Sequence, residues 1–287
     1  MSPVRRLTSL ARPLDPGWPT NRAVLFLMPL GGLAFALLDD SHGWVPRAGA
    51  ALVGAGTVLG GWALGRELDP DRQGAAFVAM ALAVTAALVE PTARLVVLFA
   101  LLVLVRTVNR TVGPPATLPD LVAGLALAGV SAVALGAPEI MLGAALAFGA
   151  DAALGGPGRS RWAAVVALGV TGLLAAGGSL IGVGPWRWGA PSPGGLGVTA
   201  VVAVGFVAAL LRTGSVESVS DLTGEPLQAR RIRWGMAVAL AVAVATLLHG
   251  DPGIRQGVLV WATLAGVALW RGLDGLTAGG GGRRRDG

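Results

Sequence analysis

One acidic residue lies inside an apolar stretch of this 287-residue chain, and it is the first candidate for chemistry. Asp151 stands in the segment AFGADAALGG, about one helical turn before that apolar stretch ends. Burying an unpaired charge in hydrocarbon costs at least ~2.5 kcal/mol, so such a residue either serves a function or is paired. Asp151 could line a polar cavity or carry a proton or cation. Alternatively, it lies at head-group depth and pairs with Arg159 or Arg161.

The longest polar loop, residues 212–233, is the second candidate site. A serine cap followed by apolar residues at intervals of three predicts a short helix in SVESVSDL. On that helix Glu217 and Asp221, four residues apart, would share one face. Together with Arg212, Arg230, Arg231 and Arg233 they could hold a divalent cation and a phosphorylated head group. An interfacial helix paired to its own arginines would explain the same residues without a substrate.

A third polar group, Arg106, Asn109 and Arg110, opens the segment RTVNRTVGPPATLPD and supplies further candidate binding residues. This segment resembles the loop after the first aspartate motif of UbiA-type prenyltransferases, and the Glu217–Asp221 spacing is similar to their second motif. The resemblance implies magnesium-dependent chemistry on a prenyl diphosphate. The aspartates that the first motif requires are replaced by Leu and Val before Arg106.

A second short motif, PGRSR at residues 157–161, resembles the PGxSRSG box of undecaprenyl diphosphate phosphatases. It is one residue shorter than that box, and no companion acidic box accompanies it. Each match covers only a short segment, so we assign the chain to neither family. The chain has no cysteine, haem-ligand pair or nucleotide-binding loop, and we expect neither a cofactor nor a metal site.

The composition determines which elements must position these residues. Hydrophobic residues make up 54% of the chain and charged residues 13%, whereas a soluble domain carries roughly 25% charged residues. The excess of apolar residues requires a lipid solvent. The net charge of +6 comes from arginines scattered between apolar runs, which argues against nucleic-acid binding. The absence of lysine and tyrosine and the scarcity of asparagine and isoleucine indicate a GC-rich, prokaryotic genome.

Apolar runs separated by charged or proline-rich breaks predict an all-α, polytopic membrane bundle of about ten helices arranged as five hairpins. Most runs are shorter than the ~20 residues that a typical span needs, so some could be re-entrant. The predicted transmembrane domain is 22–272, between a cytoplasmic segment 1–21 and a flexible cytoplasmic tail 273–287. The expected spans lie near 23–38, 48–65, 75–89, 92–108, 120–136, 139–154, 162–183, 196–211, 234–249 and 256–270.

The arginines give this topology an orientation. When the breaks are numbered alternately, eighteen arginines fall on the side that carries both termini, and four fall on the other side. Cytoplasmic loops of membrane proteins carry the excess of Lys and Arg. We therefore expect both termini in the cytoplasm, a location in the inner membrane, and attraction of the arginine-rich tail to anionic lipids.

Glycine spacing predicts close helix packing, since small residues let helices approach one another in lipid. These faces serve either general packing or a contact with a second copy or a membrane partner. GxxxG pairs occur at Gly56 and Gly60, Gly61 and Gly65, and Gly178 and Gly182.

Three functional hypotheses follow from these patterns. The first is a transporter or channel, which the number of predicted spans favours. Because buried charge is scarce, its solute would be small and neutral or hydrophobic. The second is an inner-leaflet enzyme acting on a lipid or polyprenyl phosphate. The third is a non-catalytic subunit of a membrane complex.

Overall fold

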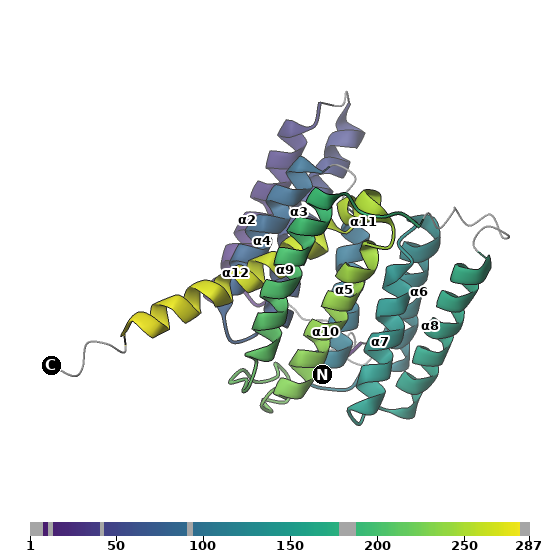
Figure 1. Cartoon of the computed structure of the whole chain (residues 1–287). Coiled ribbons are helices and arrows are strands. Elements are labelled where there is room, and N and C mark those ends of the chain that lie inside the picture. Colours follow the sequence, from purple (N-terminus) through teal and green to yellow (C-terminus); the bar gives the residue numbers. More distant parts are fainter. Residues whose placement is uncertain (1–7, 11–13, 41–42, 91–93, 178–187, 282–287) are drawn as a thin grey trace.

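The computed structural model describes residues 8–10, 14–40, 43–90, 94–177 and 188–281, apart from the side chains of 176–177 and 277–281. This part of the chain is a helical bundle in which no strand is formed (Figure 1). The helices are α2 (Pro19–Leu38), α3 (Trp44–Leu68), α4 (Gln73–Val89), α5 (Leu95–Asn109), α6 (Leu118–Ala134), α7 (Glu139–Ala153), α8 (Gly158–Gly177), α9 (Pro193–Leu211), α10 (Ala229–Thr246), α11 (Gly250–Gln256) and α12 (Val258–Gly281).

Each apolar run expected to form a helix overlaps one. The short α11 lies in the expected break between the last two runs and meets α12 at a bend of 69°. By length and composition, α2, α3 and α9 could cross a membrane, and the bent pair would make a fourth span. Helices α4, α5 and α6 are apolar but shorter. Helix α12 continues to Gly281, through the first part of the segment expected to be a flexible tail.

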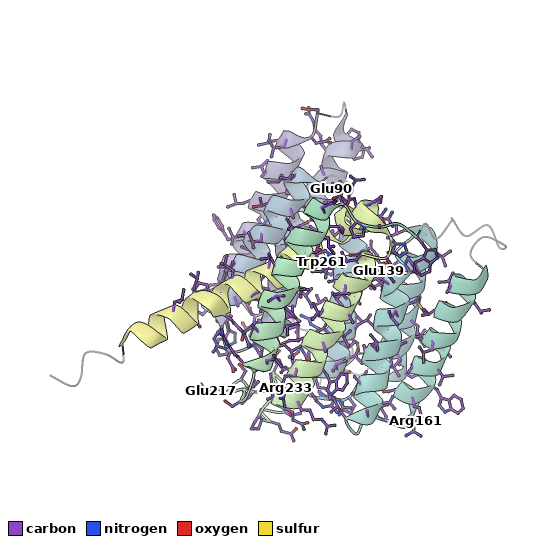
Figure 2. The ribbon with its side chains drawn as sticks, viewed as in Figure 1. Glu90, Glu139, Arg161, Glu217, Arg233 and Trp261 are labelled. Atoms are coloured by element: carbon purple, nitrogen blue, oxygen red, sulfur yellow. The ribbon has the colours of Figure 1, made fainter. Side chains whose placement is uncertain are left out.

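Successive helices from α2 to α10 run in opposite directions, so the bundle has two distinct ends (Figure 1). Arg161, Glu217 and Arg233 lie at one end in Figure 2, and Glu90 and Glu139 lie at the other. We call the first the arginine-rich end. One half of the bundle is built around α3, which contacts α2, α4, α5 and α12. The other half is built around α7, which contacts α5, α6, α8 and α10.

The outward faces of the bundle are apolar, which is the reverse of the pattern in a soluble protein. Phe26 and Leu37 of α2 and Val198 and Val204 of α9 are among the large hydrophobic side chains that lie exposed. The interior contains small residues, such as the buried alanines of α4, and several buried charges. Apolar side chains on this scale are stable on a surface only against lipid or another apolar partner, so the bundle is suited to a membrane.

Two of the predicted GxxxG pairs pack inside the chain. A Cβ atom added to Gly65 would lie 2.8 Å from Cβ of Ala79 and 2.9 Å from Cα of Ala76, so α4 rests directly on α3. A Cβ at Gly60 would lie 2.8 Å from Cδ2 of Leu98, on α5. Helix α3 therefore presents one glycine face to α4 and another to α5. The third pair, Gly178 and Gly182, lies outside the described residues.

Replacing Gly65 with Ala should lower the free energy of unfolding by about 1–3 kcal/mol, because the added methyl group has no space against the α4 backbone. Unfolding in detergent, followed by circular dichroism, measures the change. Gly197→Ala is the matched control, since nothing lies within 4 Å of its added Cβ. An equal response of the two variants would contradict the close contact between α3 and α4.

Candidate functional site at the arginine-rich end

Three buried carboxylates organise the arginine-rich end. Glu67, Asp69 and Asp151 are each at most 1% exposed, and each accepts hydrogen bonds from an arginine of another helix. An unpaired buried charge would cost several kcal/mol, so these pairings are a condition for folding. They join helix ends that are far apart in the sequence.

Asp151 binds two arginines. Its Oδ1 accepts from Nη2 of Arg110 at 2.8 Å and from Nη1 of Arg231 at 2.9 Å, and its Oδ2 accepts from Oγ of Ser160 at 2.8 Å. Arg231 also donates to the carbonyl oxygens of Val108 and Leu154. Both carboxylate oxygens are therefore occupied, and the partners of Asp151 are these two arginines rather than those expected from the sequence.

The end of α5 is built to make these contacts. Arg110 has a left-handed backbone conformation (φ 55°), which ends α5 and turns its side chain toward Asp151. Arg106 donates from Nε to Oε1 of Glu67 at 2.9 Å, and Asn109 donates from Nδ2 to the Glu67 carbonyl at 2.7 Å. The polar residues of this segment thus hold α5 against α3 and α7.

Asp69 fixes the position of α12. Nε of Arg271 donates to Oδ2 of Asp69 at 2.7 Å, while Nη1 donates to the carbonyl of Ala209 at 2.7 Å and to Oγ1 of Thr213 at 2.6 Å. Arg72 is the second partner of Asp69, at 3.4 Å, and reaches Asp274 at 2.9 Å. Burial lowers the pKa of Arg72, but the charges of Asp69 and Asp274 outweigh this and leave the pKa raised.

The loop between α9 and α10 corrects one sequence expectation, because residues 213–228 form no helix. The backbone N–H groups of Glu217 and Ser218 donate instead to the carboxylate of Asp71, the latter at 2.8 Å. The N–H of Asp221 donates to the carbonyl of Thr111 at 3.0 Å. These bonds hold the backbone extended, so Glu217 and Asp221 do not share a helical face.

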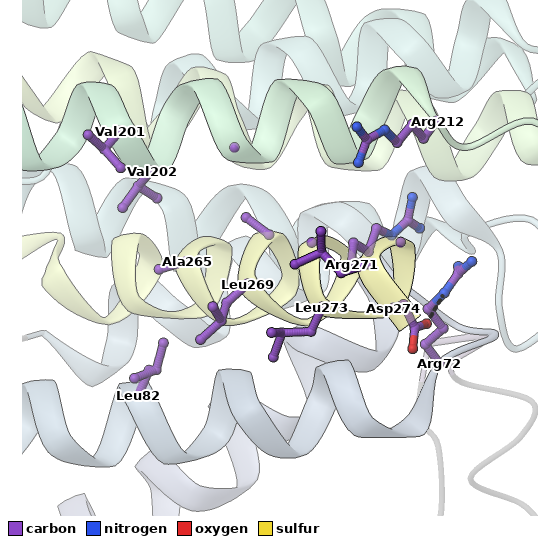
Figure 3. A pocket seen from close by; sticks show the side chains of 15 residues that line it. Arg72, Leu82, Val201, Val202, Arg212, Ala265, Leu269, Arg271, Leu273 and Asp274 are labelled. Atoms are coloured by element: carbon purple, nitrogen blue, oxygen red, sulfur yellow. Dashed lines mark hydrogen bonds and ion pairs between the residues drawn. The ribbon is translucent and has the colours of Figure 1, made fainter. Parts of the chain in front are cut away.

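An amphipathic groove of about 1370 Å³ lies between α4, α9 and α12 (Figure 3). Its walls are mostly aliphatic, and several of them are exposed: Val201 is 75% exposed and Leu276 is 76% exposed. Charged residues gather at one end only. The aliphatic part is lined by Leu82, Val201, Val202, Ala265, Ala268, Leu269, Leu273 and Leu276, and the charged part by Arg72, Arg212, Arg271 and Asp274.

A polar chamber of about 390 Å³ adjoins the charged end of the groove, with which it shares its three arginines. Its other charged residues are Asp69, Asp71 and Glu217. Along the two cavities, the lining residues are first aliphatic, then arginines and finally carboxylates.

Arg212 differs from the other arginines of the groove. Its side chain is exposed at the groove end, and it makes no ion pair with any described residue. Arg271 and Arg72, by contrast, are held by Asp69 and Asp274. Arg212 is therefore the cation best able to accept an anionic ligand.

The structure divides the predicted site residues into three groups. Asp151, Arg106, Asn109, Arg110 and Arg231 belong to the buried network, and none of them lines the groove or the chamber. Glu217 lines the chamber. Asp221 lines a third cavity of about 550 Å³ beside it, and Arg230 lies exposed at the start of α10.

Four charged residues of the chamber were not candidates from the sequence: Asp69, Asp71, Arg72 and Arg271. For Asp69 and Arg271 the sequence signal is the similar helix ending RELD at Arg66–Asp69 and RGLD at Arg271–Asp274. In the structure the aspartate of the first ending accepts from the arginine of the second.

The opposite end has looser polar contacts. Nε2 of His249 is 3.7 Å from Oε2 of Glu139, and Nε of Arg255 is 3.9 Å from Oε2 of Glu90. These side chains come from α4, α7 and the α11 region. The groove and the two polar cavities lie at the arginine-rich end instead.

No family model, curated protein or solved structure matches this chain.

Asp151→Asn should lower the free energy of unfolding by about 3–5 kcal/mol, because it leaves the buried Arg231 without a counter-charge. Chemical unfolding in detergent measures this loss. Glu225→Gln is the control, since Glu225 is an exposed acid of the nearby loop. If Asp151 instead carried a proton or cation during transport, the variant would remain stable and lose transport.

Proposed function

We propose that this chain is a multi-pass membrane protein that binds a hydrophobic or amphipathic molecule drawn from one leaflet, as a transporter of a lipid-soluble solute does. In this proposal the chain crosses the membrane ten times, with α11 and α12 forming one bent span. Both termini and the arginine-rich end face the cytoplasm. The observation that carries the proposal is the groove between α4, α9 and α12, which opens on an exposed apolar surface.

The distribution of charge supports this orientation. The described arginines that lie near helix ends at the arginine-rich end outnumber those at the opposite end, where the described ones are Arg47, Arg94 and Arg255. This asymmetry is the pattern that sets membrane-protein orientation. The short helices α4, α5 and α6 are accommodated where polar end residues extend each span or the bilayer thins.

Single-cysteine labelling tests the topology, because the chain has no cysteine of its own. Arg255→Cys should react with a membrane-impermeant maleimide on intact cells, since this side chain is 57% exposed at the opposite end. Glu225→Cys, exposed at the arginine-rich end, should react only after permeabilisation. Labelling of both variants on intact cells would contradict the proposed topology.

The length of the groove favours a ligand from a single leaflet. Along α9 it extends from Val201 to Arg212, which at about 1.5 Å per residue is roughly 16 Å. The hydrocarbon core of a bilayer is about 30 Å thick, so the groove spans about half of it. A chain lying in the groove would have its end near the middle of the bilayer and its head at the arginines.

The surroundings of Asp151 argue against a polar route through the bundle at that residue. Asp151 is fully buried, and its two oxygens are occupied by Arg110, Arg231 and Ser160. A hydrophobic or amphipathic ligand needs no such route, since it enters from the lipid. This is why the proposal favours the groove over a proton-coupled or cation-coupled pathway.

The polar chamber beside the groove favours a second candidate function, an inner-leaflet enzyme that acts on a lipid phosphate. Its carboxylates and arginines lie where the head of a groove-bound lipid would be. The two functions differ in the fate of the ligand. A change in the mass of the bound lipid during incubation would identify an enzyme, and an unchanged mass is expected of a transporter.

Filling the groove tests ligand binding directly. Gly205→Leu should weaken binding of dioleoylglycerol at least about tenfold, because a Cβ added there already lies 3.4 Å from Cβ of Ala268 across the groove. Native mass spectrometry of the detergent-purified protein measures the apparent dissociation constant.

The matched control is Gly197→Leu, on the same helix but outside the groove, where nothing lies within 4 Å of the added Cβ. Its affinity should equal that of the unmodified protein. Equal binding by all three proteins would remove the groove as the ligand site.

A further inference from the structure

We infer that the ligand of the groove is a phospholipid with an amine-bearing head group, whose phosphate binds at Arg212 and whose ammonium group binds at Asp71 and Glu217. The inference rests on the proposed function, because it names the class of ligand that the groove accepts. It comes from the order in which aliphatic, cationic and anionic residues follow one another along the two adjoining cavities.

The first part of the ligand is set by the aliphatic wall. Val202 of α9 and Ala265 and Leu269 of α12 line the groove, and Leu82 of α4 closes it below α12 in Figure 3. None of these side chains has a polar atom to bind. This stretch is therefore complementary to an acyl chain.

The second part is set by the arginines. In Figure 3, Arg212 and Arg72 lie on opposite sides of α12 at the same end of the groove. Arg212 has no ion pair among the described residues, and Arg72 is 43% exposed beyond its contacts with Asp69 and Asp274. Guanidinium groups are suited to phosphate because their N–H donors form parallel, charge-assisted hydrogen bonds.

The third part is set by the carboxylates of the chamber. The Asp71 carboxylate accepts from two backbone N–H groups, those of Glu217 and Ser218, but no described cation neutralises it. The Glu217 side chain is exposed and likewise has no described ion pair. Two negative charges are thus left uncompensated just beyond the arginines.

This order distinguishes among head groups. A purely anionic phosphate would gain from Arg212 but would face the charges of Asp71 and Glu217. An ammonium group attached to the phosphate would lie between those two carboxylates, so each charge of the ligand would face groups of opposite sign. The charge pattern is therefore complementary to a zwitterionic aminophospholipid.

Three dioleoyl lipids separate the contributions of chain, phosphate and amine. The measurement is the apparent dissociation constant of dioleoyl phosphatidylethanolamine, phosphatidic acid or diacylglycerol, from native mass spectrometry of the purified full chain. Arg212→Ala should weaken both phospholipids about tenfold, the loss of one charge-assisted contact, and leave diacylglycerol unchanged. Glu217→Gln should weaken phosphatidylethanolamine several-fold and leave phosphatidic acid unchanged or bound more tightly.

Arg161→Ala and Glu225→Gln are the matched controls, since both side chains are exposed at the same end but line neither cavity. Unfolding midpoints equal to that of the unmodified protein would show that the test variants fold. Equal loss of both phospholipids in Glu217→Gln would overturn the amine assignment, as would loss of binding in a chelator, which would place a divalent cation at the carboxylates.

Other outcomes separate this inference from the proposed function. If diacylglycerol binds as tightly as phosphatidylethanolamine and Gly205→Leu weakens both, the groove is a lipid site and the head-group inference is wrong. If Gly205→Leu affects no lipid, the proposed function itself fails. Displacement of the lipid by inorganic phosphate at the same concentration would show a site for free phosphate instead.

Discussion

The arginine-rich end depends on one constraint, that a carboxylate taken out of water must find donors to replace its lost hydration. Glu67, Asp69 and Asp151 satisfy it with arginines from other helices. Within a bilayer the alternative is an uncompensated charge, so these pairs select which helix ends can meet. Glycine faces let helices such as α3 and α4 approach closely, and the charged pairs add a further specific contact at this end.

The pairing of Asp69 with Arg271 also shapes the groove. It ties the middle of α12 to the end of α3, while Arg271 additionally binds the carbonyl end of α9 through Ala209. Helix α12 enters from a 69° bend with α11 and crosses the bundle obliquely before its end leaves it (Figure 1). Helix α12 packs on both α4 and α9, and the groove lies along the surface where these three helices meet.

Part of this architecture is accessible from the sequence. Apolar runs and charged breaks locate the helices because burial in lipid has a strong compositional signature, and the alternation of arginines agrees with the two ends of the bundle. The ion pairs were not predictable, since they depend on which helix ends meet in space. Asp151 illustrates this: Arg159 and Arg161 are near it in the sequence, but Arg110 and Arg231 bind it. The loop helix was wrong for a similar reason, because the distant Asp71 recruits the amides of Glu217 and Ser218.

The distinction between saturated and unsaturated charge separates scaffold from candidate site. Asp151 is the most conspicuous acidic residue of the sequence, yet its hydrogen-bonding capacity is taken up within the fold. Arg212 and Glu217 belong to the polar loop whose predicted helix does not form, and their charges have no ion-pair partner among the described residues beside a cavity. A charge that is paired within the protein contributes to the stability of the fold. A charge without an ion-pair partner beside an apolar groove can form an ion pair with a ligand and so contribute to its binding. In a membrane bundle with few ionisable residues, the second kind is the better guide to where binding occurs.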